Sequence, residues 1–246
     1  MNLKGKTILV SGAGGGIGTA LVRALLEKGA AKIYAGARST PALEELLQID
    51  RVRIIPVELD ITVPASVAAA ARQCSDVDLL VNNAGVNRCM GLLEPHAMEA
   101  ARAEMEVNYF GTLAMCRAFA PILARRGNGA IANVCSIIGL VNLPVNGSYC
   151  ASKAAGHSLI QGIRAELAPA GVRVVGIYPG PVDTSMTAGQ AMPKATSMQV
   201  AGAIIAGLAN GDEEIYPDPM SEDVQRKLMA APKQVEQQFA AMIPAR

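Results

Sequence analysis

The chain has 246 residues, of which 51% are hydrophobic and 17% are charged, and its formal net charge is +1. This composition provides ample apolar material for a large core, so we expect residues 1–246 to form one domain. A nearly neutral chain whose longest basic run is Arg125-Arg126 does not fit the dense phosphate contacts of duplex DNA binding. With no Trp and only three Phe, base stacking is also unexpected, and we predict no nucleic-acid partner.

The composition also bears on membranes, metals and compartment. No stretch approaches the roughly 20 apolar residues that a membrane helix needs, and the apolar run near the N-terminus is too short for a signal peptide. The five cysteines form no C-x-x-C pair, so they indicate neither a disulfide framework nor a zinc site, and we expect no metal. We therefore predict a cytoplasmic protein whose cysteines are mostly small buried hydrophobes.

Apolar runs and helical patterns alternate along the chain. We expect strands at 6–10, 32–35, 52–58, 78–81, 130–134 and 172–178. Their alternation with helical segments predicts an α/β fold, a single doubly wound (Rossmann) parallel sheet with helices on both faces. Beyond the sixth strand we expect a mobile flap over a site at 185–198, an edge strand at 213–216 and a terminal helix at 221–242.

The first strand runs directly into a glycine-rich turn, which a helical pattern follows. This order is typical of pyrophosphate binding, because glycines let the backbone approach the ligand and the helix N-terminus stabilises its negative charge. We therefore expect a bound dinucleotide. The contacts that we predict in this turn are Ser11, Gly12, Gly14, Gly16, Ile17 and Gly18.

The end of the second strand bears on which dinucleotide binds. In dinucleotide-binding sheets an acidic residue at this strand end binds the ribose 2′-hydroxyl and would repel a 2′-phosphate. None is present at 36–38, and Arg38 could pair with that phosphate through its planar guanidinium. We therefore favour NADP(H) over NAD(H), with a solvated turn arginine as the alternative reading of Arg38.

The ends of the later strands carry further candidate ligand contacts. In open parallel sheets, ligands bind outside the carboxyl ends of the strands. After the third strand we predict contacts from Asp60 and Ile61, and Pro64 is expected to begin the next helix. The remaining predicted cofactor contacts are Asn83, Ala84, Gly85, Pro179, Gly180, Val182 and Thr184.

Tyr149 and Lys153 stand four residues apart in a predicted helix, for which we expect Ser148 to be the N-cap. A separation of four places the phenol and the ammonium on one helix face. Ser136 follows the fifth strand, so its hydroxyl can reach the same sheet edge. Asn108 lies in a long helical stretch at 97–123, where a buried asparagine needs hydrogen-bond partners.

These residues together resemble the short-chain dehydrogenases/reductases, from about Lys6 to Thr184. The resemblance implies a single-domain oxidoreductase that interconverts a carbonyl and a secondary alcohol. It implies that Tyr149 is the general acid/base, that Lys153 holds the nicotinamide ribose, that Ser136 orients the substrate oxygen and that Asn108 supports a proton-relaying water. An ammonium about 4 Å away is worth about 4 kcal/mol at an effective dielectric near 20, so we expect Lys153 to lower the pKa of Tyr149.

The substrate and the assembly are less visible in the sequence. Apolar residues at 140–145 and in the flap favour a small, uncharged and fairly apolar carbonyl or alcohol substrate. A 3-ketoacyl thioester, whose acidic carrier would meet Arg125 and Arg126, is the alternative. A catalytically silent NAD(P)-sensing binding protein is an alternative of another class. The resemblance implies a Gly-Gly-containing C-terminal strand that many family members use for tetramer packing, and this strand is absent here. We therefore expect a homodimer, with a tetramer possible. The terminal helix is expected to pack on its own domain, with a partner subunit as the alternative.

Overall fold

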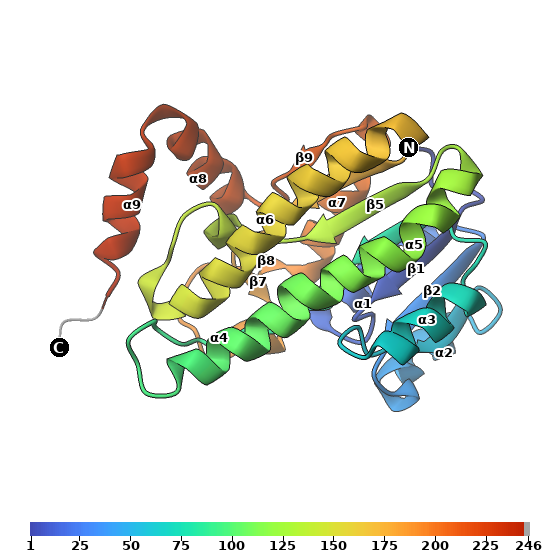
Figure 1. Ribbon diagram of the computed structural model, residues 1–246, viewed down its shortest axis with the longest axis horizontal. Helices are drawn as coiled ribbons and strands as arrows, with labels where there is room; N and C mark the ends of the chain where they lie inside the picture. Colours follow the sequence, from blue (N-terminus) through green and yellow to red (C-terminus); the bar gives the residue numbers. More distant parts are fainter. Residues whose placement is uncertain (244–246) are drawn as a thin grey trace.

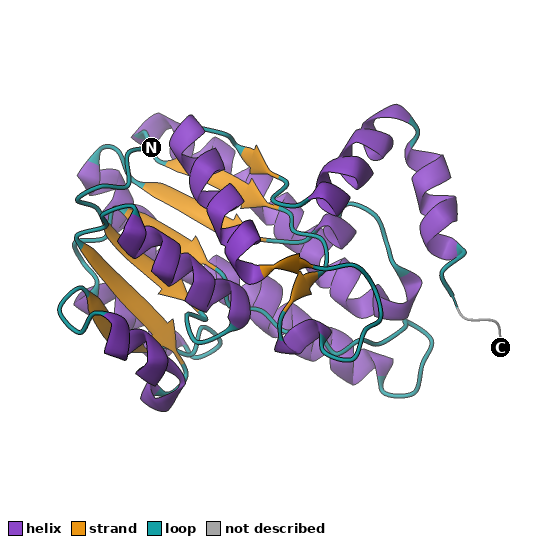
Figure 2. Ribbon diagram, turned by 180° about the vertical axis from the view of Figure 1, so that it is seen from behind, coloured by secondary structure: helices purple, strands orange, loops and turns teal. Residues whose placement is uncertain are grey.

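The computed structural model describes residues 1–243 (Figures 1 and 2). Within them a seven-stranded sheet has the order β3-β2-β1-β4-β5-β6-β9, and every neighbouring pair is parallel. Its strands are β1 (Thr7–Ser11), β2 (Lys32–Ala37), β3 (Ile54–Glu58), β4 (Leu79–Asn82), β5 (Ala130–Val134), β6 (Arg173–Ile177) and β9 (Glu214–Ile215). The predicted parallel sheet is confirmed, and so is the edge strand near residue 214.

Helices cover both faces of the sheet, as a parallel sheet requires (Figures 1 and 2). One face carries α1 (Gly16–Glu27), α2 (Glu44–Ile49) and α7 (Ser197–Asn210). The other carries α3 (Pro64–Gln73), α5 (Thr112–Arg126) and α6 (Gly147–Leu167), with α4 (Ala97–Met105) leading into α5. Pro64 begins α3 as predicted. No helix among residues 1–243 is long and apolar enough to cross a membrane.

The central strand β1 shows why the core has two halves. Ile8 and Val10 belong to the apolar cluster under α1 and α7, whereas Leu9 belongs to the cluster under α3, α5 and α6. All three side chains have 0% exposure. Successive side chains of a strand point to opposite faces, so a continuous apolar run fits a strand that is covered on both sides.

The point at which the strand order reverses lies at β1, which pairs with β2 on one side and β4 on the other. The connections that leave β1 and β4 therefore diverge at the carboxyl edge of the sheet. This is the position at which open α/β sheets bind ligands. The glycine turn after Ser11 and the loop after Asn82 both start there.

The C-terminal region corrects the predicted helix at 221–242. The structure has two helices, α8 (Pro219–Ala230) and α9 (Pro232–Ala240), with Ala231 in a non-helical conformation between them. Pro232 has no N–H and disfavours the α conformation at the residue before it, so the helix ends there. Both helices lie beyond the carboxyl end of β5 (Figure 1) and contribute to a small apolar cluster with Ile137 and Val141.

The predicted flap at 185–198 is partly regular. A short 3-10 helix spans Ser185–Thr187, and β8 (Ala195–Thr196) pairs with β7 (Val182–Asp183). Residues 197 and 198 belong to α7, whose N-cap is Thr196. The irregular part of the flap is therefore shorter than predicted, and its mobility stays a prediction.

Candidate active site

The glycine turn after β1 has a backbone path that side chains would obstruct. Gly12 has a left-handed backbone with φ of 64°, and a Cβ there would lie 2.9 Å from the Cα of Ala84. A Cβ on Gly18 would meet the carbonyl oxygen of Gly12, and one on Gly16 would lie 2.5 Å from the Cγ2 of Thr184. The turn therefore packs tightly between the loops that follow β4 and β6, as the glycine pattern predicts.

The N-terminus of α1 fits an anionic ligand. Its N-cap residue is Gly15, no side chain caps the first turn, and no acidic residue lies in that turn. The first N–H groups of this helix and its positive dipole end are therefore free of internal anionic partners. Ile17, in that turn, packs against the core below. Gly14 lies against Ala42, in the segment that follows β2.

Ser11 joins the glycine turn to the loop after β4. Its hydroxyl oxygen accepts hydrogen bonds from the N–H groups of Asn83 at 3.1 Å and Ala84 at 3.2 Å, and the hydroxyl lies 3.4 Å from the Val81 carbonyl oxygen. The Asn83 amide in turn donates to the carbonyl oxygens of Ser11 and Gly12. The Asn83 side chain thus holds the turn in place, a role that the sequence did not indicate.

Arg38 lies exposed beyond the end of β2, and Asp60 follows β3 at the same edge of the sheet. The Asp60 carboxylate accepts hydrogen bonds from the hydroxyl and the N–H of Thr62, and these two bonds, with a smaller contribution from Arg38, lower the pKa of Asp60. Ile61 is buried, and Gly111 packs closely against it. Asp60 therefore carries negative charge beside Arg38.

Helix α6 and the end of β5 bring Tyr149, Lys153 and Ser136 together. The Lys153 ammonium donates to the Val134 carbonyl oxygen at 3.0 Å and lies 5.6 Å from the centroid of the Tyr149 ring. Ser136 donates its hydroxyl to the Pro179 carbonyl oxygen at 3.3 Å. The exposed fractions of Ser136, Tyr149 and Lys153 are 7%, 8% and 6%, so all three polar side chains are buried.

The start of α6 corrects one prediction. The helix begins at Gly147 after the N-cap residue Asn146, and Ser148 is the second helical residue. The Ser148 hydroxyl donates to the Met90 carbonyl oxygen at 3.3 Å and does not cap the helix. The sequence signal for an N-cap is local, whereas this hydroxyl has found a partner from a distant loop.

The charges in the cluster also differ from the prediction. Burial raises the pKa of Tyr149, and the interaction of its phenol with the Ser136 hydroxyl only partly offsets this increase. Burial also lowers the pKa of Lys153. The Lys153 ammonium lies 5.6 Å from the centroid of the Tyr149 ring and donates its hydrogen bond to the Val134 carbonyl oxygen. In the protein alone, desolvation therefore outweighs the attraction between ammonium and phenolate, and the phenol stays protonated.

Asn108 lies within the helical stretch predicted at 97–123, at a point where the structure departs from a continuous α-helix. A π-helical segment (Glu106–Gly111) separates α4 from α5. The Asn108 Oδ1 accepts the Val86 N–H at 2.9 Å, and its Nδ2 donates to the Val86 carbonyl oxygen and to the Ser152 hydroxyl, each at 2.9 Å. The prediction that a buried asparagine needs partners is confirmed. Such π segments are frequent at functional sites.

Gly85 shows that Asn108 and Lys153 are neighbours. A Cβ built on Gly85 would lie 3.2 Å from the Asn108 Oδ1 and 3.5 Å from the Lys153 Nζ. The backbone at residue 85 therefore passes between the amide and the ammonium. The structure thus brings Asn108, Ser136, Tyr149 and Lys153 into one region next to the glycine turn.

The loop after β6 completes the site through a residue that the sequence analysis missed. The buried Asp218 carboxylate accepts the Gly180 N–H at 2.7 Å and also caps α8 by accepting the Ser221 N–H at 2.9 Å. Val182 is buried in β7, and Thr184 is the N-cap residue of the 3-10 helix of the flap. An Asp-Pro pair before a helical pattern is a start signal, so Asp218 could have been found from the sequence.

The apolar residues expected near the substrate are partly accessible. Val145, Met186 and Met192 have exposed fractions of 38%, 41% and 43%. Cys135 and Cys150, which adjoin Ser136 and Tyr149, are free and buried. Within residues 1–243, no group of three or more His, Cys, Asp or Glu side chains could hold a metal ion.

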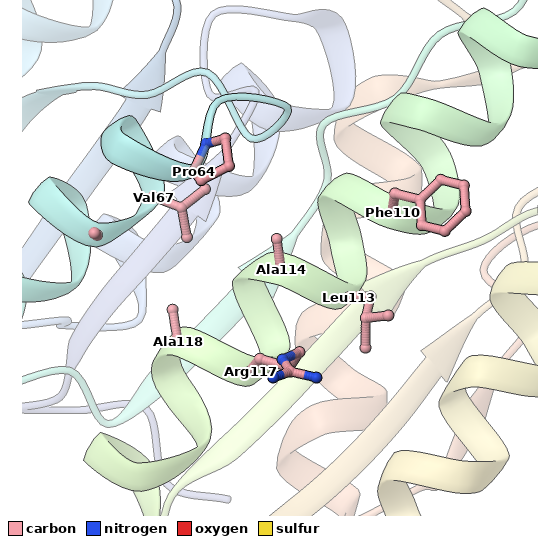
Figure 3. Close-up of a pocket in the computed structure, with 8 residues that line it drawn as sticks. Pro64, Val67, Phe110, Leu113, Ala114, Arg117 and Ala118 are labelled. Atoms are coloured by element: carbon pink, nitrogen blue, oxygen red, sulfur yellow. The ribbon is translucent and has the colours of Figure 1, made fainter.

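A shallow groove lies elsewhere, on the outer face between α3 and α5 (Figure 3). Its lining includes Pro64, Val67, Phe110, Leu113 and Arg117 but none of the predicted site residues. Phe110 is 51% exposed. This groove is therefore separate from the candidate active site.

Comparisons with known proteins were made by sequence and by structure. Residues 6–194 match the family model described as short chain dehydrogenase. An uncharacterized oxidoreductase from Staphylococcus epidermidis is 32% identical over 213 residues, which cover 84% of this chain and 92% of that protein.

Two solved structures cover essentially the whole chain. A short chain dehydrogenase from Burkholderia cenocepacia in complex with NADP is 44% identical, with a TM-score of 0.92 over 99% of this chain and 100% of that one. A short chain dehydrogenase/reductase from Burkholderia phymatum in complex with NAD is 25% identical, with a TM-score of 0.85 over 100% of this chain and 99% of that one. These two proteins bind different cofactors, so the preference of the present chain must be argued from its own residues.

Proposed function

Because the chain belongs to the short-chain dehydrogenase/reductase family, we propose that it interconverts a carbonyl and a secondary alcohol with NADP(H), using Tyr149 as general acid/base. The observation that carries this proposal is the buried convergence of Ser136, Tyr149 and Lys153 next to the glycine turn. A sensor that only binds the cofactor has no need for a proton-transfer group in this position. The convergence therefore favours an enzyme over a silent binding protein.

When bound, the nicotinamide supplies or accepts the hydride. The residues of this chain manage the proton and the orientation of the substrate. The Ser136 hydroxyl binds the substrate oxygen, and Tyr149 donates its phenolic proton to that oxygen as the carbonyl is reduced. Burial raises the pKa of this phenol, so the protonated form that donates is the one present before the substrate oxygen accepts the proton. Lys153 holds the nicotinamide ribose and stabilises the phenolate that remains.

Asn108 completes the proposed set, because its amide lies next to the Lys153 ammonium across Gly85. There it supports a water through which Lys153 exchanges protons with the solvent. Its other hydrogen bonds, to Val86 and Ser152, fix the orientation of the amide. The role of Asn108 is therefore to hold the relay and not to touch the substrate.

The test of this function is a cofactor-oxidation assay with a panel of apolar ketones and aldehydes. Tyr149→Phe should lower kcat by at least about 100-fold, the usual contribution of a general acid, and should leave the Kd of NADPH within about threefold. Tyr34→Phe removes a phenol that pairs with Asp76 outside the site and serves as the matched control. Near wild-type turnover by Tyr149→Phe would refute the assignment, and NADPH binding without turnover on any substrate would favour the sensor.

We propose NADP(H) as the preferred cofactor because Arg38 is exposed at the end of β2, where a 2′-phosphate would lie, and no acidic residue accompanies it at 36–38. A charge-assisted hydrogen bond of about 1.5–3 kcal/mol corresponds to roughly 10- to 150-fold in affinity. Arg38→Ala should therefore weaken NADPH by at least about tenfold and NADH much less, in fluorescence titrations. The exposed Arg51→Ala is the control, and equal losses for both cofactors would show that Arg38 is only a solvated turn residue.

For the substrate we propose a small and fairly apolar molecule, because Val145, Met186 and Met192 offer accessible apolar surface in the segments expected to contact it. The alternative 3-ketoacyl thioester is less favoured. Arg126, one of the two arginines expected to meet an acidic carrier, donates to the Asp78 carboxylate at 2.7 Å. Comparing free ketones with the same ketones as thioesters in the panel decides between the two classes.

We propose a homodimer as the assembly. Helices α5 and α6 run side by side on the outer face (Figure 1), and the exposed Phe110 lies in the π-helical segment that precedes α5. These helices resemble the pair through which family members form dimers. Light scattering coupled to size exclusion should give twice the chain mass, and four times that mass would indicate the tetramer instead.

A further inference from the structure

Glu104 is a buried carboxyl group that the proposed reaction does not use. Its exposed fraction is 0%. One carboxylate oxygen, Oε1, accepts the Arg88 N–H at 2.6 Å, and the other, Oε2, has no hydrogen-bond partner among residues 1–243. Removing a carboxylate from water is costly unless it is paired and fully hydrogen-bonded. A side chain that lowers stability in this way calls for a functional explanation.

We propose that Glu104 is a positioning residue that holds the segment Val86–Met90, called here the 86–90 segment, against the reacting groups. This inference rests on the proposed function, because it assigns Glu104 a part in the reaction of Tyr149. Glu104 itself touches neither substrate nor cofactor in this proposal. It acts through the backbone of Arg88.

The 86–90 segment is tied to the site at both ends. At its start, Val86 exchanges two hydrogen bonds with the Asn108 amide, both at 2.9 Å. At its end, the Met90 carbonyl oxygen accepts the Ser148 hydroxyl at 3.3 Å. Ser148 immediately precedes Tyr149, and Gly85 lies next to the Lys153 ammonium. The segment therefore bridges two of the proposed catalytic groups.

Between these ends the backbone is not self-supporting. Cys89 has a left-handed conformation with φ of 50°, which is uncommon for a residue other than glycine. A local turn, in which the Asn87 side chain accepts the Cys89 N–H at 2.7 Å, helps to hold it. Glu104 is the only partner of the Arg88 N–H among the hydrogen bonds of the described residues. Without it, the middle of the segment would depend on this local turn and on the Gln190 amide, which donates to the Cys89 sulfur at 3.7 Å.

Glu104 lies on a helix that packs against the helix carrying Tyr149. It lies in α4, one helical turn before Asn108, and α4 packs directly against α6, which carries Tyr149. Burial raises the pKa of Tyr149, and the negative charge of Glu104 adds to this increase. Burial raises the pKa of Cys89, from the segment, and of Cys150, from α6, and the charge of Glu104 adds to both increases. Among residues 1–243, these three groups are the ones whose raised pKa includes a contribution from Glu104.

Two substitutions separate the hydrogen bond from the charge. Glu104→Gln keeps an amide oxygen that can accept the Arg88 N–H but removes the charge, whereas Glu104→Met removes both at nearly constant volume. Glu106→Gln makes the same change of charge on an exposed residue two positions away and is the matched control. Steady-state kinetics, pH profiles and hydrogen exchange of the 86–90 amides are measured for each variant.

We expect Glu104→Met to lower kcat by at least about tenfold and to leave the KM of NADPH within about threefold, because the reacting groups lose their alignment. Exchange at the 86–90 amides should accelerate. Glu104→Gln should restore kcat to within about threefold of the wild type. In the alcohol-oxidation direction, its kcat/KM should rise at a lower pH than in the wild type, because the phenolate no longer faces a negative charge. The control should change neither property.

Wild-type kcat and wild-type exchange at 86–90 in Glu104→Met would overturn the proposal. Lower thermal stability in both variants, with unchanged kcat and pH profile, would show a merely structural residue and overturn it equally. Failure of the proposed function itself would appear in the cofactor-oxidation assay, as an inactive wild type or a fully active Tyr149→Phe. The exchange measurement does not depend on turnover, so unchanged 86–90 exchange in Glu104→Met overturns the positioning role in that case as well.

Discussion

Ser11→Ala tests the hydrogen bonds that join the glycine turn after β1 to the loop after β4. Ser11 is 1% exposed, and its hydroxyl oxygen accepts the N–H groups of Asn83 and Ala84. Alanine leaves the β1 backbone unchanged but removes the common acceptor of two N–H groups. Threonine also carries a hydroxyl on its Cβ and therefore retains the acceptor. The perturbation is therefore confined to these hydrogen bonds.

The expected magnitude follows from the cost of unpaired donors. Leaving a buried N–H without a partner costs about 1–3 kcal/mol. The Asn83 and Ala84 N–H groups are partly buried, so about 1–2 kcal/mol each is appropriate, giving about 2–4 kcal/mol for Ser11→Ala. For a chain of this size, such a loss lowers Tm by roughly 5–15 °C. Ser11→Thr should stay within about 1.5 kcal/mol of the wild type, because one added methyl group is its only change.

The assay is urea unfolding followed by circular dichroism, in which a lower midpoint at unchanged m reports lost stability. Ser39→Ala is the control, since Ser39 is exposed and its side chain makes no capping hydrogen bond. The Kd of NADPH should rise in Ser11→Ala, because the loop at 83–84 and the glycine turn move relative to each other. A midpoint for Ser11→Ala equal to that of Ser39→Ala would refute the reasoning.

Two further predictions concern the edges of the sheet. Asp218→Ala should lower the free energy of unfolding by about 2–3 kcal/mol, because it removes a helix cap and leaves the Gly180 N–H unpaired. Asp218→Asn should retain most of the cap. Equal urea midpoints for the two variants would contradict this prediction. Burial raises the pKa of Asp78, but the Thr7 N–H and Arg126 outweigh it and the net pKa is lowered. The pKa of Asp78 in the folded state thus lies below its value in the unfolded state, which is near 3.9. The ionised Asp78 carboxylate therefore stabilises the fold above that pH, and this stabilisation is lost as the pH falls through the folded-state pKa. The wild-type midpoint should therefore fall more steeply below about pH 4 than that of Asp78→Asn, and parallel profiles would contradict the assignment.

The ion pair between Arg126 and Asp78 also bears on whether the substrate is carried by an acidic protein. Arg126 is engaged by a buried carboxylate at the amino end of β4. It therefore stabilises the sheet and lies at the opposite end from the site. An acidic carrier that docked on this arginine would be far from Ser136 and Tyr149 along the strand direction, and this distance is our reason for proposing a free apolar substrate.

The sequence by itself determined the features that depend on local chemistry. The alternation of apolar runs gave the parallel sheet, because a strand buried on both faces needs a continuous apolar run. The glycines at 12 and 18 marked the nucleotide turn, since a residue without Cβ adopts the left-handed backbone of Gly12 without strain and leaves room for the close contacts at both positions. The spacing of Tyr149 and Lys153 placed both on one helix face. Pro232 is likewise a local signal for the end of a helix, but the sequence analysis did not use it and predicted one continuous helix at 221–242.

Only the tertiary structure decided which polar groups become partners. The Asn83 amide binds a carbonyl 72 positions away, and the Asp218 carboxylate binds an N–H 38 positions away, so no local pattern could reveal either bond. The sequence of the π segment around Asn108 is equally compatible with an ordinary helix, and in the fold this segment contacts Ile61 and Val86. Glu104 reads as one more charged helix residue, and it is burial that makes it exceptional. Desolvation, which sets the protonation of Tyr149 and Lys153, likewise exists only once the chain has folded around them.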